Sequence, residues 1–232
     1  MFGFTPDEWT AILLSLRVAS VGTLVGLPIA LFLAFILARG RFPGKVLLDG
    51  FLHLPLVLPP VVTGYFLLLT FGRQGAIGKA LYDWLGFTFS FRWTGAALAC
   101  GIMGFPLMLR AIRLSFEAID RRLETASSTL GANAYWTFLL VTLPLSLPGI
   151  LVGAILCFAK ALGEFGATIT FVSNIPGETE TIPTAIYTYT QVPGGEFQAF
   201  RLACVSVFIA MIALIVSEVL NRRIQKRIAV FE

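Results

Sequence analysis

Five long apolar stretches constrain this chain more than any other feature of its sequence. Each has roughly the twenty mostly apolar residues that an α-helix needs to cross the hydrocarbon core of a bilayer. Only 13% of the residues are charged and 57% are hydrophobic, whereas a soluble domain has about 25% charged residues. Too little polar surface remains to coat a water-exposed globule. The sequence therefore predicts an all-α, polytopic bundle in a single domain over residues 1–232, with spans at 12–37, 46–71, 93–109, 143–171 and 203–220.

The basic residues between these stretches predict the orientation of the bundle. Five spans place the termini on opposite sides of the membrane, and Lys and Arg are enriched in short cytoplasmic loops. The N-terminus is therefore expected outside and the C-terminus in the cytoplasm, and the positive net charge reflects topology, not nucleic-acid binding. Eleven basic residues flank the expected cytoplasmic ends (Arg39, Arg41, Lys45, Arg110, Arg113, Arg121, Arg122, Arg222, Arg223, Lys226 and Arg227), and four flank the other ends (Arg73, Lys79, Arg92 and Arg201).

Residue patterns that hold metals or nucleotides are scarce. The three cysteines lie in apolar runs without a C-x-x-C pair, and the single histidine has no H-E-x-x-H partner. Gly78-Lys79 resembles the end of a phosphate-binding loop, but Arg73 stands where that loop needs a glycine and Ala80 where it needs Ser or Thr. We expect no metal site, no cofactor and no ATP site on this chain, and no enzymatic activity of its own.

The segment of about residues 117–143, between the third and fourth predicted spans, is the most informative. Acidic residues precede small ones, Gly131 can end a short helix, and a second helical stretch leads to Leu143-Pro144. This order predicts a compact helix–glycine–helix unit that projects into the cytoplasm. Its chemistry alone is equally compatible with a docking surface for a partner and with an ordinary amphipathic loop.

The spacing in this unit resembles the EAA loop of ABC importer permeases, which reads E-A-A, three residues, Gly, nine residues, then I-x-L-P. The chain departs from the pattern at Thr125 and Ser127, and Glu124 supplies the acidic group one place earlier. In that family the loop is the coupling helix, which docks in a groove of the cytoplasmic ATPase. The resemblance implies that the coupling residues are Glu124, Thr125, Ala126, Ser127, Gly131, Val141, Leu143 and Pro144.

Three further blocks resemble the molybdate permease subunits of these importers, namely 41–45 (RFPGK), 53–60 (HLPLVLPP) and 163–178 (GEFGATITFVSNIPGE). Sulfate permeases share the GEFG of the third block and are less similar beyond it. The resemblance implies a type I importer permease in the bacterial inner membrane that works as a homodimer. Its partners would be an ATPase subunit that binds ATP and an external oxyanion-binding protein facing residues 173–200. Molybdate is the expected cargo, with tungstate or sulfate as alternatives.

Polar residues in and beside the fourth predicted span are candidates for the translocation path. On one helix, Lys160 and Glu164 would share a face, and a charge in mid-bilayer costs about 2.5–3.5 kcal/mol, so both should face protein or water. We favour a mutually neutralising structural pair, because a carboxylate would repel a dianion. Neutral donors nearby suit either brief contact with an oxyanion or hydrogen bonds between helices. The candidates are Lys160, Glu164, Thr168, Thr170, Ser173 and Asn174.

The proline-rich run 55–60 predicts a break in the regular hydrogen bonding of the second span, because prolines remove helical hydrogen bonds. The resulting kinked helix either faces the pore or is a static bend. A rival hypothesis is a channel or secondary transporter that needs no ATPase. A channel should show a filter motif or rings of charge, and a carrier should show paired halves. Neither pattern is visible in the sequence.

Overall fold

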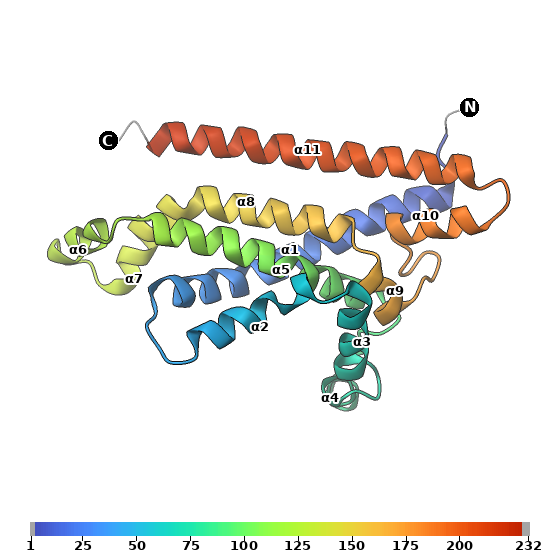
Figure 1. Ribbon diagram of the computed structural model, residues 1–232, viewed down its shortest axis with the longest axis horizontal. Helices are drawn as coiled ribbons and strands as arrows, with labels where there is room; N and C mark the ends of the chain where they lie inside the picture. Colours follow the sequence, from blue (N-terminus) through green and yellow to red (C-terminus); the bar gives the residue numbers. More distant parts are fainter. Residues whose placement is uncertain (1–2, 229–232) are drawn as a thin grey trace.

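In a computed structural model the chain is a helical bundle drawn out along one axis (Figure 1). The structure describes residues 3–228 and has no strand among them, which confirms the all-α prediction. The helices are α1 (Pro6–Arg39), α2 (Lys45–Val57), α3 (Pro60–Phe71), α4 (Ala76–Leu85), α5 (Trp93–Ala118), α6 (Arg121–Thr129), α7 (Ala134–Thr137), the π-helical turn η1 (Phe138–Thr142), α8 (Leu143–Leu162), α9 (Gly166–Val172), α10 (Ile182–Gln191) and α11 (Glu196–Ile228).

The centre of the bundle is built from α1, α5 and α8, which cross one another at small residues. A Cβ atom added at Gly22 of α1 would lie 2.6 Å from the carbonyl oxygen of Ala97 in α5. One added at Gly104 of α5 would lie 2.6 Å from Sγ of Cys157 in α8. Only glycine allows backbones to approach this closely, which is how helices commonly pack in membranes.

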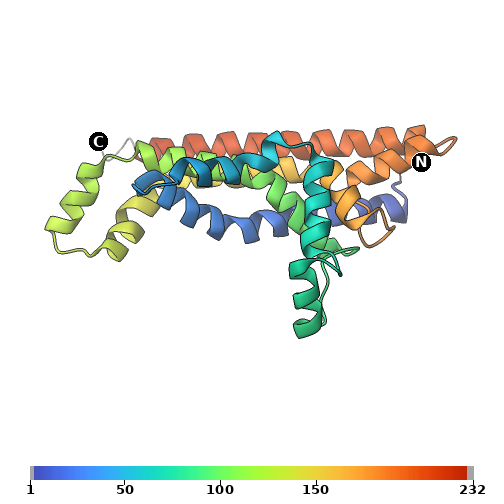
Figure 2. The ribbon, with the colours of Figure 1, turned by 60° about the horizontal axis from the view of Figure 1, so that its bottom comes forward.

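Within residues 3–228, four continuous helical stretches are long and apolar enough to cross a membrane: α1, α5, the stretch from Ala134 to Leu162, and α11 as far as Leu220. The second predicted span is not one helix, because α2 and α3 meet at an angle of 113°. Pro59 and Pro60 lie at the bend, where each lacks the N–H that a continuous helix would use. The predicted break is thus confirmed, and α3 and α4 project from the bundle (Figures 1 and 2).

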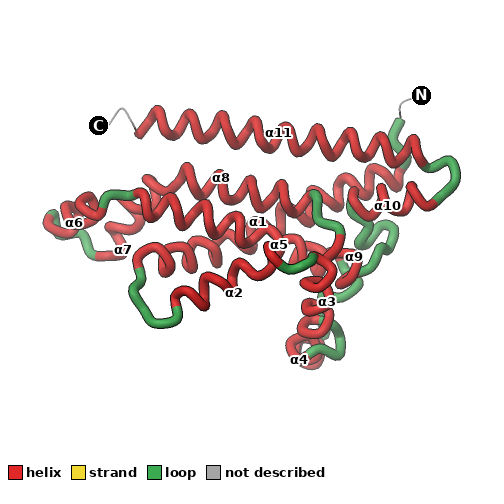
Figure 3. The backbone as a smooth tube through the Cα atoms, in the orientation of Figure 1, coloured by secondary structure: helices red, strands yellow, loops and turns green. Residues whose placement is uncertain are grey.

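Several predicted boundaries were wrong, because hydropathy marks the apolar part of a helix and misses its polar turns. The third predicted span corresponds to α5, which continues to Ala118, into the predicted cytoplasmic loop. The fifth corresponds to α11, which begins at Glu196 instead of residue 203. The fourth predicted span is divided, since α8 ends at Leu162 and α9 begins at Gly166. The predicted external segment 173–200 contains α10, so that only short loops join the helices there (Figure 3).

The start of α1 is tied to α11 by a buried carboxylate that the sequence did not reveal. Glu8 is fully buried, and its two carboxylate oxygens accept hydrogen bonds from Nη2 of Arg201 at 2.8 and 2.6 Å. One of these oxygens also accepts from the backbone N–H of Thr5, which completes a capping box at the start of α1. The contact joins residues 193 positions apart and closes the bundle at this end.

Candidate functional site

A helix–glycine–helix unit extends beyond the ends of α5 and α8, as the pattern at 117–143 predicts (Figure 1). The side chain of Asp120 caps α6 by accepting from the N–H of Arg122. At the other end Gly131 has φ +89°, and the N–H of Ala132 donates to the carbonyl of Ser127. This 6→1 bond and the left-handed residue are the features of a Schellman turn, which suits glycine. The turn reverses the chain into α7.

Glu124 anchors this unit to the membrane bundle. Its Oε1 accepts from Nη2 of Arg39 at 2.8 Å and from Oγ1 of Thr142 at 2.9 Å. Arg39 lies in the last turn of α1, and the Arg39 and Glu124 side chains are largely buried, at 14% and 23% exposure. The carboxylate predicted to belong to a docking surface therefore points into the chain, where it fixes α6 against α1 and η1.

Other residues of the unit face outward. Thr125, Ala126, Gly131 and Pro144 are exposed, whereas Ser127, Val141 and Leu143 are half-buried. Ser127 joins α6 to α7, because its hydroxyl oxygen lies 3.2 Å from that of Thr137.

Large apolar side chains are also exposed on this unit, and the sequence analysis missed them. Leu130 is 89% exposed, and Tyr135 and Trp136 lie on the far side of the glycine turn with more than half of their surface exposed. The signal of Leu130 was present in the sequence, since it is a large apolar residue in the mostly polar stretch 120–134. An anchored unit with apolar side chains at its tip has the properties of a protein-docking surface.

The break between α8 and α9 brings Lys160 and Glu164 together, but not on one helix as predicted. Glu164 lies beyond the end of α8, where its Oε2 accepts from Nζ of Lys160 at 2.8 Å. Its Oε1 accepts from the N–H of Ala167 at 3.0 Å, in the first turn of α9. The Glu164 side chain is 1% exposed and that of Lys160 is 32% exposed. The carboxylate is therefore neutralised by the lysine and also caps the next helix.

The break also places α9 directly against α3. A Cβ atom at Gly64 of α3 would lie 2.6 Å from the carbonyl oxygen of Ala167. On the other side of the contact, a Cβ atom at Gly166 would lie 2.8 Å from Cβ of Pro60. Two glycines thus let the start of α3, immediately after the proline bend, approach the start of α9.

Most of the remaining candidates for the translocation path form hydrogen bonds within the chain, whereas the side chain of Ser173 is exposed. The hydroxyls of Thr168 and Thr170 donate to backbone carbonyls of the preceding turn. Asn174 donates to Oγ1 of Thr188 at 2.7 Å and to Glu180 at 3.4 Å, and burial raises the pKa of the Glu180 carboxyl against the effect of that hydrogen bond. Ser173 has φ +64° and accepts from Thr179 through its carbonyl. The contact between Asn174 and Thr188 joins the loop after α9 to α10.

Two polar cavities are each lined by two arginines. One, of about 410 Å³, lies between α2 and α5 near the expected cytoplasmic ends and is lined by Asp49, Gly50, His53, Arg110, Arg113, Leu114 and Glu117. Here Arg113 forms ion pairs of 2.9 Å with Asp49 and 2.8 Å with Glu117. The second, of about 480 Å³, lies where α3 and α4 meet the loop to α5.

The sequence matches the family described as binding-protein-dependent transport system inner membrane component over residues 26–228. It is 59% identical over 223 residues to the molybdenum transport system permease protein ModB of Escherichia coli K12, covering 96% of this chain and 97% of that protein. It is 56% identical over 221 residues to ModB of Haemophilus influenzae, covering 95% and 96%. A solved bacterial ABC transporter involved in alginate import has the same fold, with a TM-score of 0.70 at 17% identity, over 96% of this chain and 80% of that one.

Proposed function

Because the chain belongs to the family of binding-protein-dependent transport system inner membrane components, we propose that it carries molybdate through the inner membrane as the permease subunit of an ATP-driven importer. The observation that carries the proposal is its identity, over nearly its whole length, to two molybdenum permeases. Tungstate and sulfate are tetrahedral dianions like molybdate and are the alternative cargoes.

The projecting unit of α6 and α7 is the proposed docking surface for a separate ATPase subunit, which binds and hydrolyses the ATP. Two properties support this role. The exposed tip at Leu130, Tyr135 and Trp136 offers apolar surface to a partner. The Arg39–Glu124 ion pair gives the unit a fixed position on α1, so that a force on its tip reaches the membrane helices.

The proposed orientation places the N-terminus outside and the C-terminus in the cytoplasm. The ends of the described chain lie at opposite ends of the long axis, and α11 runs toward the end that carries α6 (Figure 1). That end also carries Arg39, Arg113, Arg121 and Arg122, as the enrichment of basic residues in cytoplasmic loops requires. The last four residues, 229–232, lie outside the described part of the chain.

A second copy of the chain and an external oxyanion-binding protein complete the proposed assembly. The binding protein would face the segment 173–200. We assign Lys160 and Glu164 a structural role, because the carboxylate is buried against its own lysine and the first turn of α9. A dianion would meet a carboxylate there and gain no free cation.

The test is uptake of radiolabelled molybdate into proteoliposomes that contain the permease, its ATPase subunit and the oxyanion-binding protein. We expect uptake only with ATP inside and the binding protein outside, and none with an ATPase variant that cannot hydrolyse ATP. Excess unlabelled molybdate should abolish the signal more effectively than tungstate or sulfate. Uptake by the permease alone, driven by an ion gradient, would overturn the proposal in favour of a secondary transporter.

A further inference from the structure

The cavity between α4 and the start of α5 has a lining suited to an anion. It is lined by Arg73, Tyr82, Gly86, Thr88, Ser90, Phe91 and Arg92, and no carboxylate is among these residues. Neither Arg73 nor Arg92 forms an ion pair in the described part of the chain, whereas Arg113 in the cytoplasmic cavity forms two. The cavity beside α4 thus has two guanidinium groups without ion pairs, those of Arg73 and Arg92, near the hydroxyls of Thr88 and Ser90.

Arg73 is held at this cavity by the ring of Tyr82. Its Cζ lies 4.6 Å from the ring centroid, and its Nη2 donates to the phenol oxygen at 3.0 Å. A guanidinium that is positioned by an aromatic neighbour retains other N–H groups for a ligand, because it has five in all. The ring also limits the freedom that Arg73 would lose on binding.

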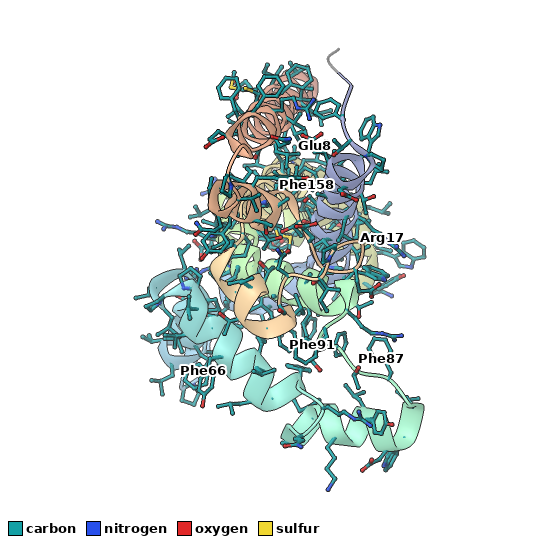
Figure 4. All side chains as sticks on the ribbon, turned by 90° about the vertical axis from the view of Figure 1, so that its right-hand side faces the viewer. Glu8, Arg17, Phe66, Phe87, Phe91 and Phe158 are labelled. Atoms are coloured by element: carbon teal, nitrogen blue, oxygen red, sulfur yellow. The ribbon has the colours of Figure 1, made fainter. Side chains whose placement is uncertain are left out.

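The chain between α4 and α5 turns sharply to complete the lining. Phe91 has φ +60°, a left-handed conformation that is uncommon for a residue other than glycine. At this turn three consecutive residues, Ser90, Phe91 and Arg92, line the same cavity, and Ser90 is only 5% exposed. Figure 4 shows Phe87 and Phe91 on this connecting segment, beside the projecting α3–α4 arm. Such strain is frequent where a backbone is shaped for a ligand.

We propose that this cavity binds a tetrahedral oxyanion group between Arg73 and Arg92, with the hydroxyls of Thr88 and Ser90 as additional donors. Guanidinium groups match the oxygen geometry of such groups and bind them through paired hydrogen bonds. A third cavity, which shares Arg73 and Tyr82, contains Lys79 and also the carboxylate of Asp83, and it is therefore less suited to an anion. By the proposed orientation the site is external.

The bound group has two possible sources. One is the free oxyanion that the permease imports, and this alternative rests on the proposed function. The other is the phosphate of a phospholipid headgroup. The test uses the purified permease without ATPase or binding protein, so that it is independent of uptake. Binding of radiolabelled molybdate is measured by equilibrium dialysis, and retained phospholipid is measured by native mass spectrometry. The variants are Arg73→Gln and Arg92→Gln, and Lys79→Gln is a control with the same change of charge outside the cavity.

We expect Arg73→Gln and Arg92→Gln each to weaken the binding of one of the two ligands by roughly ten- to a hundred-fold, which is the effect of losing one charged hydrogen-bond donor. Lys79→Gln should leave the binding of that ligand unchanged. Loss of molybdate binding identifies the cargo as the ligand, and loss of retained phospholipid identifies a headgroup. The lysine variants Arg73→Lys and Arg92→Lys keep the charge and should restore part of the binding. If neither ligand responds, or if Lys79→Gln has the same effect, the cavity is not an oxyanion site. Failure of uptake with intact binding would instead count against the proposed function alone.

Discussion

The projecting α6–α7 unit and the break between α8 and α9 each depend on a carboxylate bound by a cationic side chain. The two ion pairs differ in how far apart their partners lie in the sequence. Glu124 binds Arg39, 85 residues away, whereas Glu164 binds Lys160, four residues away. The distant pair fixes one element of the tertiary structure to another. The local pair neutralises a charge and caps a helix. Damage to the first should therefore reduce coupling, and damage to the second should reduce folding.

The largest effect is expected from Lys160→Met, which leaves the buried Glu164 carboxylate without its cation. Breaking a buried ion pair by removing one partner costs about 3–5 kcal/mol, so the yield of folded protein should fall sharply. The measurement is the amount of monodisperse permease after size-exclusion chromatography in detergent. Glu164→Gln should be milder, because its amide oxygen can still accept from the N–H of Ala167 and because Lys160 is 32% exposed.

The double variant, with Lys160→Met and Glu164→Gln together, sharpens this prediction. It should recover much of the lost yield, since no charge is stranded. Normal yield in both single variants, combined with lost transport, would show instead that the pair belongs to the translocation path.

A smaller effect on folding and a selective effect on transport are expected from Arg39→Gln. The variant removes a charged hydrogen bond worth about 1.5–3 kcal/mol, which loosens α6 from α1 but leaves the core of α1, α5 and α8 intact. Uptake per inserted permease should fall several-fold, while the yield changes little. Arg41→Gln is the matched control, because Arg41 is exposed and forms no ion pair in the described part of the chain. Equal uptake in the two variants would remove the ion pair from the coupling mechanism.

The smallest effect is expected from Gly131→Val. No atom lies within 4 Å of an added Cβ, so the cost is the left-handed backbone itself, at φ +89°. That cost is about 1–2 kcal/mol and disfavours the turn that ends α6. Co-purification of the ATPase subunit should weaken, whereas Gly131→Asn should retain it because Asn tolerates this conformation. An unchanged complex and parental uptake with valine would argue against the turn as part of the docking surface.

Local features of this fold could be predicted from the sequence. The apolar runs located the membrane helices, the prolines at 55–60 located the bend before α3, and Gly131 located the turn after α6. Each depends on properties of neighbouring residues, such as length, a missing N–H or a permissive backbone. The end of α8 at Leu162 was missed because the predicted span included Gly163 and Glu164, between two apolar stretches, in one continuous helix.

Contacts between distant segments could not be predicted in the same way. Nothing in the local sequence pairs Arg39 with Glu124, or Glu8 with Arg201, because packing decides which cation reaches which carboxylate. The sequence consequently assigned Glu124 to the docking surface, although its carboxylate faces inward. The residues that do face outward, such as Leu130, could have been found as large apolar side chains in a polar segment.

The most direct test of ATPase coupling compares photo-crosslinking from two sites with nearly the same exposure. Leu130 on the α6–α7 unit is 89% exposed, and Trp84 on the α3–α4 arm is 88% exposed. A photoreactive residue is placed at each position in turn, and the assembled transporter is irradiated in membranes. We expect a crosslink to the ATPase subunit from position 130 and none from position 84. Capture of the ATPase from position 84, or its absence at position 130 in a complex that still transports, would contradict the account.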